Sequence, residues 1–62
     1  MDITITINTD NDAFQDSMLR YEVSDILREL SEEINRFGIV NKPLRDINGN
    51  TCGKVEISNT DL

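Results

Sequence analysis

Three glutamates near the middle of this 62-residue chain come nearest to acid–base chemistry. Glu29, Glu32 and Glu33 lie within five positions of one another, and closely placed carboxylates can transfer protons in an enzyme. The same spacing is typical of the solvated face of an amphipathic helix, which is the interpretation we favour. The chain has no histidine, and no glycine-rich phosphate loop follows its first strand-like segment. The sequence therefore predicts no enzymatic activity, no catalytic residue and no cofactor.

Cysteine and metal chemistry are equally restricted. Cys52 is the single cysteine, and one cysteine without histidine does not supply a common zinc ligand set. The segment 46–50 resembles the start of a calcium loop, but that pattern requires Gly at its sixth position and Glu at its twelfth, where this chain has Thr51 and Ile57. We expect a hairpin turn there and no metal site. A redox role for Cys52 would require a lowered thiol pKa, and a position in a strand offers no helix N-terminus to lower it.

Tyr21 is the residue that most favours a binding surface. On a helical wheel it lies near the middle of the polar face with Asp25, Arg28 and Glu32, and Tyr and Arg are enriched at interface hot spots. The alternative is that the helix begins later and that Tyr21 packs against the preceding loop. The predicted partner-binding surface consists of Tyr21, Asp25, Arg28, Glu29, Glu32 and Glu33.

The net charge of −6 belongs entirely to the first part of the chain. Residues 1–38 hold nine acidic residues against three arginines, whereas residues 39–62 hold three of each sign. Such a field repels phosphate backbones, so we expect no direct nucleic-acid binding and a partner protein with a basic surface. The alternative is that the charge only keeps the protein soluble. Lys42, Arg45 and Lys54 are the basic residues that could meet the acidic helix of another copy head to tail.

A strand and a helix account for the first half of the chain. Residues 2–8 alternate polar and apolar side chains, with Ile and Thr alternating over 3–7, which predicts a half-buried strand with Ile3, Ile5 and Ile7 on its inner face. Polar turn residues follow, and Phe14 is expected to fold back into the core. A helix is predicted over 18–37, with Asp16 or Ser17 as N-cap and Gly38 as its stop. Its apolar arc of roughly 100° contains Leu19, Val23, Ile26, Leu27, Leu30, Ile34 and Phe37.

The second half predicts a hairpin with strands at 40–47 and 51–57. Asn48-Gly49 favours a two-residue type I′ turn, in which both central residues have positive φ. A bulged three-residue loop is the alternative, and the two loops pair different residues with Leu44. Pro43 cannot donate a ladder hydrogen bond, so its strand belongs at an edge, and Gly53 is a candidate bulge position.

Together these elements predict an α+β fold of order β-α-β-β. We expect a three-stranded sheet with the third strand central and the helix packed across one face, in a single domain spanning 1–62 with a frayed tail at 58–62. A chain of this length buries only about 60% of its unfolded surface, so we expect a homo-oligomer, as a dimer, to supplement the core. No segment approaches a membrane span or a signal peptide. The free cysteine fits a reducing, cytoplasmic location.

The hairpin motif Leu-Arg-Asp-Ile-Asn-Gly-Asn-Thr at 44–51 also carries a resemblance. With Thr9-Asp10-Asn11, Phe14 and the helical segment 23–30, it resembles small accessory proteins of tailed bacteriophages and prophages. Cys52 departs from the aliphatic residue expected there. The resemblance implies a phage product that acts in the cytoplasm of a bacterial host. It supplies no functional residues.

Three hypotheses about function follow. The first is a phage-encoded inhibitor that binds a host protein, including an anti-defence (anti-CRISPR-like) factor, because small acidic phage proteins often block host factors such as defence nucleases. The second is a homo-oligomeric structural or assembly accessory protein of the phage, in which edge strands pair between copies. The third is a protein that sequesters a small ligand between protomers.

Overall fold

The computed structural model describes residues 1–58 and has the predicted α+β order. Its elements are β1 (Asp2–Ile7), a short 3-10 helix η1 (Asp12–Phe14), α1 (Met18–Phe37), β2 (Lys42–Arg45) and β3 (Thr51–Ser58). The prediction of a helix over 18–37 is confirmed at both ends. Ser58 is the last residue of β3, and the remainder of the predicted frayed tail, 59–62, lies outside the described residues.

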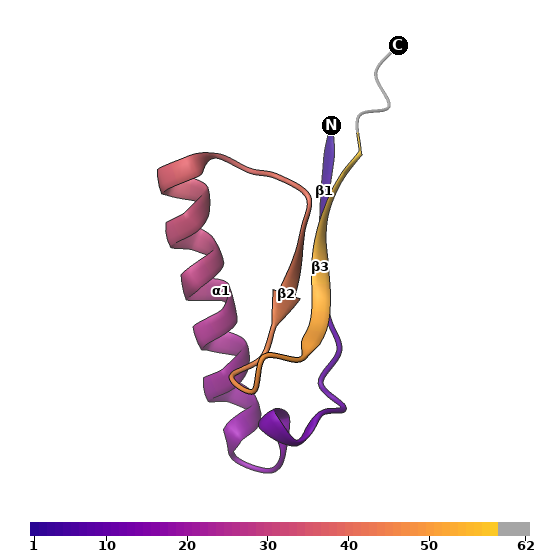
Figure 1. Cartoon of the computed structure of the whole chain (residues 1–62), viewed down its shortest axis with the longest axis vertical. Helices are drawn as coiled ribbons and strands as arrows, with labels where there is room; N and C mark the ends of the chain where they lie inside the picture. Colours follow the sequence, from indigo (N-terminus) through magenta and orange to yellow (C-terminus); the bar gives the residue numbers. More distant parts are fainter. Residues whose placement is uncertain (59–62) are drawn as a thin grey trace.

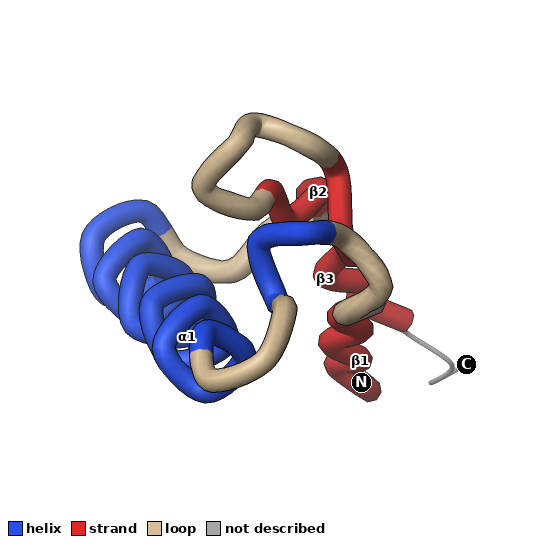
Figure 2. The backbone as a smooth tube through the Cα atoms, turned by 90° about the horizontal axis from the view of Figure 1, so that it is seen from below, coloured by secondary structure: helices blue, strands red, loops and turns tan. Residues whose placement is uncertain are grey.

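The three strands form one antiparallel sheet in the order β1-β3-β2, so the third strand is central, as predicted. In β1, Ile5 pairs with Val55, and in β2, Leu44 pairs with Gly53. Figure 1 shows α1 running beside the sheet, with the chain from its end crossing over to β2. Figure 2, seen along the strands, shows α1 on one face of the sheet only.

The core lies between α1 and the sheet and contains few side chains. Phe14, which follows the turn after β1, is 3% exposed and confirms the prediction that it folds into the core. The sheet contributes buried side chains to this core from β2 and β3, whereas β1 contributes only the half-buried Ile7 at its end. The buried apolar residues are Phe14, Ile26, Leu30, Leu44, Cys52 and Val55.

The prediction of a half-buried first strand is wrong for most of β1. Ile3 and Ile5 remain 45% and 42% exposed, and only Ile7 is half-buried. The reason is the position of α1, whose buried residues Ile26 and Leu30 belong to a core that takes side chains from β2 and β3 but only Ile7 from β1. The alternation of Ile and Thr gave the correct strand and the correct inner face, but α1 leaves that part of the face uncovered.

The first hairpin strand is shorter than predicted. We expected it over 40–47, whereas β2 spans Lys42–Arg45. At its start, the side-chain Oδ1 of Asn41 accepts the backbone N–H of Ile57 at 2.6 Å, in place of a bond from strand to strand. At its end, Asp46 already belongs to the turn. Pro43 lies on an edge strand, as predicted.

The hairpin turn is the bulged alternative and not type I′. Gly49 has φ of 82°, but Asn48 does not have the positive φ that a type I′ turn requires. The carbonyl of Asp46 accepts the N–H of Gly49 at 3.0 Å, and the N–H of Asp46 donates to the carbonyl of Asn50 at 2.9 Å. The pairing then shifts between Leu44 and Arg45, which leaves Cys52, the neighbour of Gly53, as the extra residue of a bulge.

Candidate protein-binding surface

The ends of α1 fix where the predicted surface residues lie. The helix begins at Met18, so Tyr21 is in its first turns and the alternative of a later start is wrong. Ser17 occupies the N-cap position without a side-chain hydrogen bond, and Asp16 turns the chain with φ of 52°. Gly38 ends the helix with φ of 85°, and its N–H donates to the carbonyl of Ile34 at 2.9 Å. A residue with a Cβ would be strained there, which is why glycine follows the helix.

A buried carboxylate sets how α1 is rotated about its axis. Glu22 is 6% exposed, and its Oε2 accepts the backbone N–H of Ile47 at 2.8 Å. Because Glu22 is buried together with Ile26 and Leu30, the buried face of α1 is displaced from the centre of its apolar arc. Leu27, at the edge of that arc, therefore stays 42% exposed. The burial of Glu22 was not predicted, because a helical wheel that scores only hydrophobicity assigns every glutamate to solvent.

The six predicted residues do share one side of α1, which we call the polar flank: Tyr21, Asp25, Arg28, Glu29, Glu32 and Glu33. This flank lies on the side of β2. Glu29 and Glu33 line a hollow of about 340 Å³ between α1 and β2, and Asp25 and Glu29 line a second hollow of about 300 Å³ beside the hairpin. The helix therefore brings the predicted surface together as one strip.

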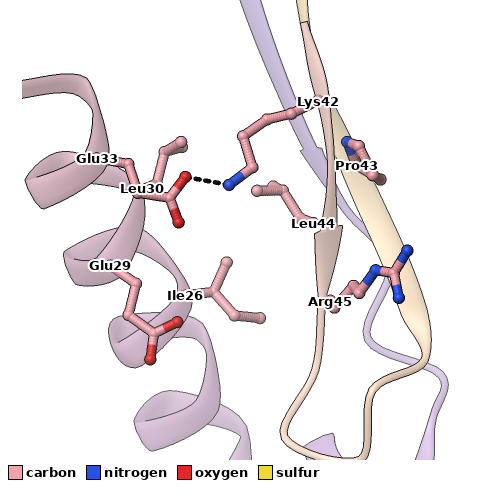
Figure 3. Close-up of a pocket in the computed structure, with 8 residues that line it drawn as sticks. All are labelled: Ile26, Glu29, Leu30, Glu33, Lys42, Pro43, Leu44 and Arg45. Atoms are coloured by element: carbon pink, nitrogen blue, oxygen red, sulfur yellow. Dashed lines mark hydrogen bonds and ion pairs between the residues drawn. The ribbon is translucent and has the colours of Figure 1, made fainter. Parts of the chain in front are cut away.

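Figure 3 shows the residues that line the hollow of about 340 Å³ between α1 and β2. Ile26, Leu30 and Leu44 form its apolar floor, and Lys42 reaches from β2 to an ion pair with Glu33. The side chain of Arg45 points away from α1, on the opposite face of the sheet. The floor is apolar and the rim carries charges from both α1 and β2.

The acids of the polar flank differ in what they contact. Asp25 forms an ion pair with Arg28 at 2.6 Å, and Glu33 pairs with Lys42. Glu29 and Glu32 form no ion pair within residues 1–58. Two of the three basic residues that were expected to meet the acidic helix of another copy form ion pairs within their own copy. Lys42 pairs with Glu33, and Lys54 pairs with Glu56 at 3.3 Å.

Tyr21 is 53% exposed, and its hydroxyl and its ring contact Arg20, which is not one of the residues expected around it. The guanidinium of Arg20 lies 4.8 Å from the ring centroid, and its Nη2 donates to the Tyr21 hydroxyl at 2.9 Å. A cation over the ring face stabilises this arrangement. Tyr21 is thus an exposed aromatic ring of the polar flank that is held in place by Arg20.

Asp46, in the motif that carried the resemblance, holds the hairpin together. It is 6% exposed, and its Oδ1 accepts the backbone N–H groups of Asn48 at 2.9 Å and Asn50 at 3.0 Å. Its Oδ2 accepts the side-chain Nδ2 of Asn11 at 3.1 Å, which joins the hairpin to the segment before η1. Two carboxylates, Asp46 and Glu22, therefore bond the backbone of this hairpin, and the motif has a structural explanation.

Cys52 lies beneath the hairpin, 4% exposed. Burial raises the pKa of its thiol, and the nearby carboxylates of Asp46 and Glu22 raise it further. A raised pKa keeps the sulfur as the unreactive thiol at neutral pH. Cys52 is therefore a core residue of β3.

The opposite side of α1, toward β1, has a different character. An open hollow of about 680 Å³ lies there, lined mainly by apolar atoms of Leu19, Val23 and Leu27 next to Thr9. The exposed Ile3 and Ile5 of β1 share the inner face of the sheet with Val55 and Ile57. We use the name apolar flank for the apolar side chains on this side of the molecule, some from β1 and some from α1: Ile3, Ile5, Leu19, Val23 and Leu27.

Within residues 1–58, no three His, Cys, Asp or Glu side chains converge where they could hold a metal ion. No helix in that range has the length and hydropathy of a membrane span. Comparison with protein-family models, curated proteins and solved structures found no match to the chain.

Proposed function

We propose that this protein is a phage-encoded inhibitor that binds a basic surface of a bacterial host protein through the polar flank of α1. The observation that carries the proposal is the strip itself. Glu29 and Glu32 have no ion pair within the described residues, and they lie on the same flank of α1 as the exposed ring of Tyr21, about two and three turns further along the helix. An exposed aromatic ring with adjacent charges is the composition found at interface hot spots.

The charge distribution supports a basic partner. The excess of acid lies in residues 1–38, which include α1. Potentials of opposite sign speed the encounter of two proteins and fix their orientation, and salt weakens this effect. The partner surface should therefore be rich in Lys and Arg, and binding should weaken as the salt concentration rises.

Host proteins that handle nucleic acid carry such basic surfaces, because they neutralise phosphates with Lys and Arg. Carboxylates of the polar flank would compete with phosphates for these groups. The resemblance to phage accessory proteins adds the context of host defence, so a defence nuclease or its complex is the target class that we propose.

The test uses tagged protein as bait in a bacterial lysate at about 50 mM and about 500 mM salt. A variant with Glu29→Lys and Glu32→Lys is the matched loss-of-binding bait. We expect the wild-type chain to retain a specific protein at low salt, and the variant to retain at least about tenfold less, because two attractive contacts become repulsive.

The control variant carries Asp10→Lys and Asp12→Lys, two exposed acids outside the polar flank. Each double variant replaces two negative by two positive charges and so changes the net charge from −6 to −2. Equal loss with both variants would assign binding to net charge alone and refute the polar flank. Purified target should also lose nucleic acid when the wild-type chain is added, and retention of that nucleic acid would refute inhibition by competition.

The second candidate function is a homo-oligomeric accessory protein. The observation that favours it is the free edge of β1, with Ile3 and Ile5 exposed next to it. The two functions use opposite sides of α1, so a dimer would leave the polar flank free for a host protein.

A further inference from the structure

The two edges of the sheet are protected to different degrees. The β2 edge carries Lys42, Pro43 and Arg45, which are residues that block the pairing of a further strand. The β1 edge has no charge and no proline from Ile3 to Ile7. An open edge made only of Ile and Thr readily accepts another strand. The β1 edge is therefore the one on which a strand can add.

The backbone of β1 also presents its free groups at a defined set of residues. Asn8 donates its N–H to the carbonyl of Cys52 at 2.6 Å. Bonds alternate along an antiparallel strand, so the even-numbered residues of β1 bond to β3. The N–H and C=O groups of Ile3, Ile5 and Ile7 consequently point to the free edge, and their side chains lie on the face toward α1.

This pattern is complementary to itself. When β1 of a second copy runs antiparallel with Ile5 opposite Ile5, Ile3 lies opposite Ile7, and every Ile and every Thr meets its own kind. A register shifted by one residue places Ile opposite Thr and moves the apolar residues to the wrong face. The same two-fold axis brings the helices of both copies to the same face of one six-stranded sheet, with their apolar flanks toward the axis.

Charge and area both allow this arrangement. The acids of the polar flank lie on the far side of α1, so two copies with a charge of −6 each do not place Asp25, Glu29 or Glu33 at the axis. The apolar flank is roughly 25 Å long, which is between the lengths of β1 and α1. It is roughly 20 Å deep across the helix layer and the sheet layer. Two copies would then cover about 1,000 Å², the lower end of a specific interface.

We propose that a second copy of this chain docks on the apolar flank and extends the sheet through antiparallel pairing of β1 with β1, centred on Ile5. The dimer covers Ile3, Ile5, Leu19 and Leu27, which are exposed in a single copy. It supplements a core of six buried apolar residues in a chain whose single cysteine forms no disulfide. It is independent of the proposed host partner, which uses the other flank.

The test is the mass in solution by sedimentation equilibrium from about 1 to about 100 μM, at about 150 mM salt so that like charge is screened. The wild-type chain should approach about 14 kDa, twice its 7.1 kDa. Ile5→Lys and Ile5→Glu should each weaken the dimer at least about tenfold, because like charges face each other across the axis. An equimolar mixture of the two variants should form a heterodimer of about 14 kDa, because opposite charges then meet.

Ile47→Lys is the matched control, since Ile47 is 79% exposed on the hairpin and away from the apolar flank. That variant should dimerise like the wild type. A wild-type mass of 7.1 kDa at every concentration overturns the proposal. An Ile5→Lys protein that remains dimeric also overturns it. The same holds for a mixture of the Ile5→Lys and Ile5→Glu proteins that stays monomeric although each variant keeps the wild-type circular dichroism spectrum. If either Ile5 variant loses that spectrum, Leu27→Lys replaces it as the test. The Leu27→Lys protein should keep the wild-type spectrum and dimerise more weakly, and a Leu27→Lys dimer as stable as the wild type overturns the proposal.

Discussion

The two flanks of α1 are built from the same helix and differ in how they meet the sheet. On the side of the polar flank, side chains of α1 bond to the hairpin. Glu22 accepts a hydrogen bond from the N–H of Ile47, and Glu33 pairs with Lys42 of β2. On the apolar flank, Leu19 and Leu27 of α1 and Ile3 and Ile5 of β1 all remain 42% to 45% exposed. The helix is thus fastened along one side by polar groups and left apolar along the other.

This difference shows that polar bonds, and not apolar area alone, orient the helix. A helix placed only to bury apolar area would turn Leu27 inward and Glu22 outward. The structure does the opposite, since Glu22 is 6% and Leu27 is 42% exposed. A hydrogen bond to a charged group contributes about 1.5–3 kcal/mol, which is comparable to the cost of leaving one leucine partly exposed.

The largest expected effect comes from separating β1 from the rest of the sheet. A Cβ added at Gly53 would lie 1.8 Å from the carbonyl oxygen of Thr6 in β1. Gly53→Ala should therefore force the two strands apart and lower the free energy of unfolding by at least about 3 kcal/mol, measured by urea denaturation.

Gly49→Ala is the control for Gly53→Ala. Gly49 has φ of 82° and nothing within 4 Å of an added Cβ, so only backbone strain of about 1 kcal/mol is expected. Equal losses for the two variants would show that β1 does not need this close approach, and the apolar flank would lose its structural basis.

The next effect concerns the hairpin that anchors the polar side. Asp46→Ala removes an acceptor from Asn48, Asn50 and Asn11 and should cost about 2–3 kcal/mol by the same denaturation. Asp46→Asn keeps one oxygen for the two backbone N–H groups and should lose about 1 kcal/mol. If the two substitutions cost the same, the turn bonds to Oδ1 do not stabilise the hairpin.

Replacing Glu22 tests the orientation of α1 directly. Glu22→Ala leaves the N–H of Ile47 without its acceptor and should cost about 1–2 kcal/mol, whereas Glu22→Gln retains a carbonyl oxygen and should cost less than about 1 kcal/mol. The protection of the Ile47 amide against hydrogen exchange should fall in the alanine variant and persist in the glutamine variant. Unchanged protection in both would mean that Glu22 does not hold the hairpin to the helix.

The elements of this fold were predictable because their signals are local. Residues 18–37 have a helical period and end at a glycine with positive φ, and the segment 2–8 alternates strictly. The central place of β3 followed from the edge position of Pro43 and from the hairpin. Each of these signals is contained in a few neighbouring residues.

The contacts that set the details join residues far apart in the chain. Glu22 and Ile47 are 25 positions apart, Asn41 and Ile57 are 16, and Asn11 and Asp46 are 35. No period or turn rule contains these pairs, which is why the short β2 and the burial of Glu22 were missed. The bulged turn was missed as the first choice because Asn48-Gly49 fits two loops, and the bonds to Asp46 accompany the longer one. The six residues of the polar flank were correctly grouped because helical spacing alone places them together.

The smallest expected effect is the coupling between Lys42 and Glu33, the ion pair that joins β2 to α1. Their side chains are 29% and 46% exposed, against 59% and 56% for Lys54 and Glu56 on the outer face of the sheet. Exposed pairs contribute about 0.2–1 kcal/mol, and solvent screening reduces the more exposed pair further. Double-mutant cycles with alanine should give about 0.5 kcal/mol for Lys42–Glu33 and about 0.2 kcal/mol or less for Lys54–Glu56. Salt at about 1 M should remove most of either coupling. If the two couplings are equal in low salt, Lys42 adds nothing specific to the polar flank, and Glu22 alone distinguishes the two sides of the helix.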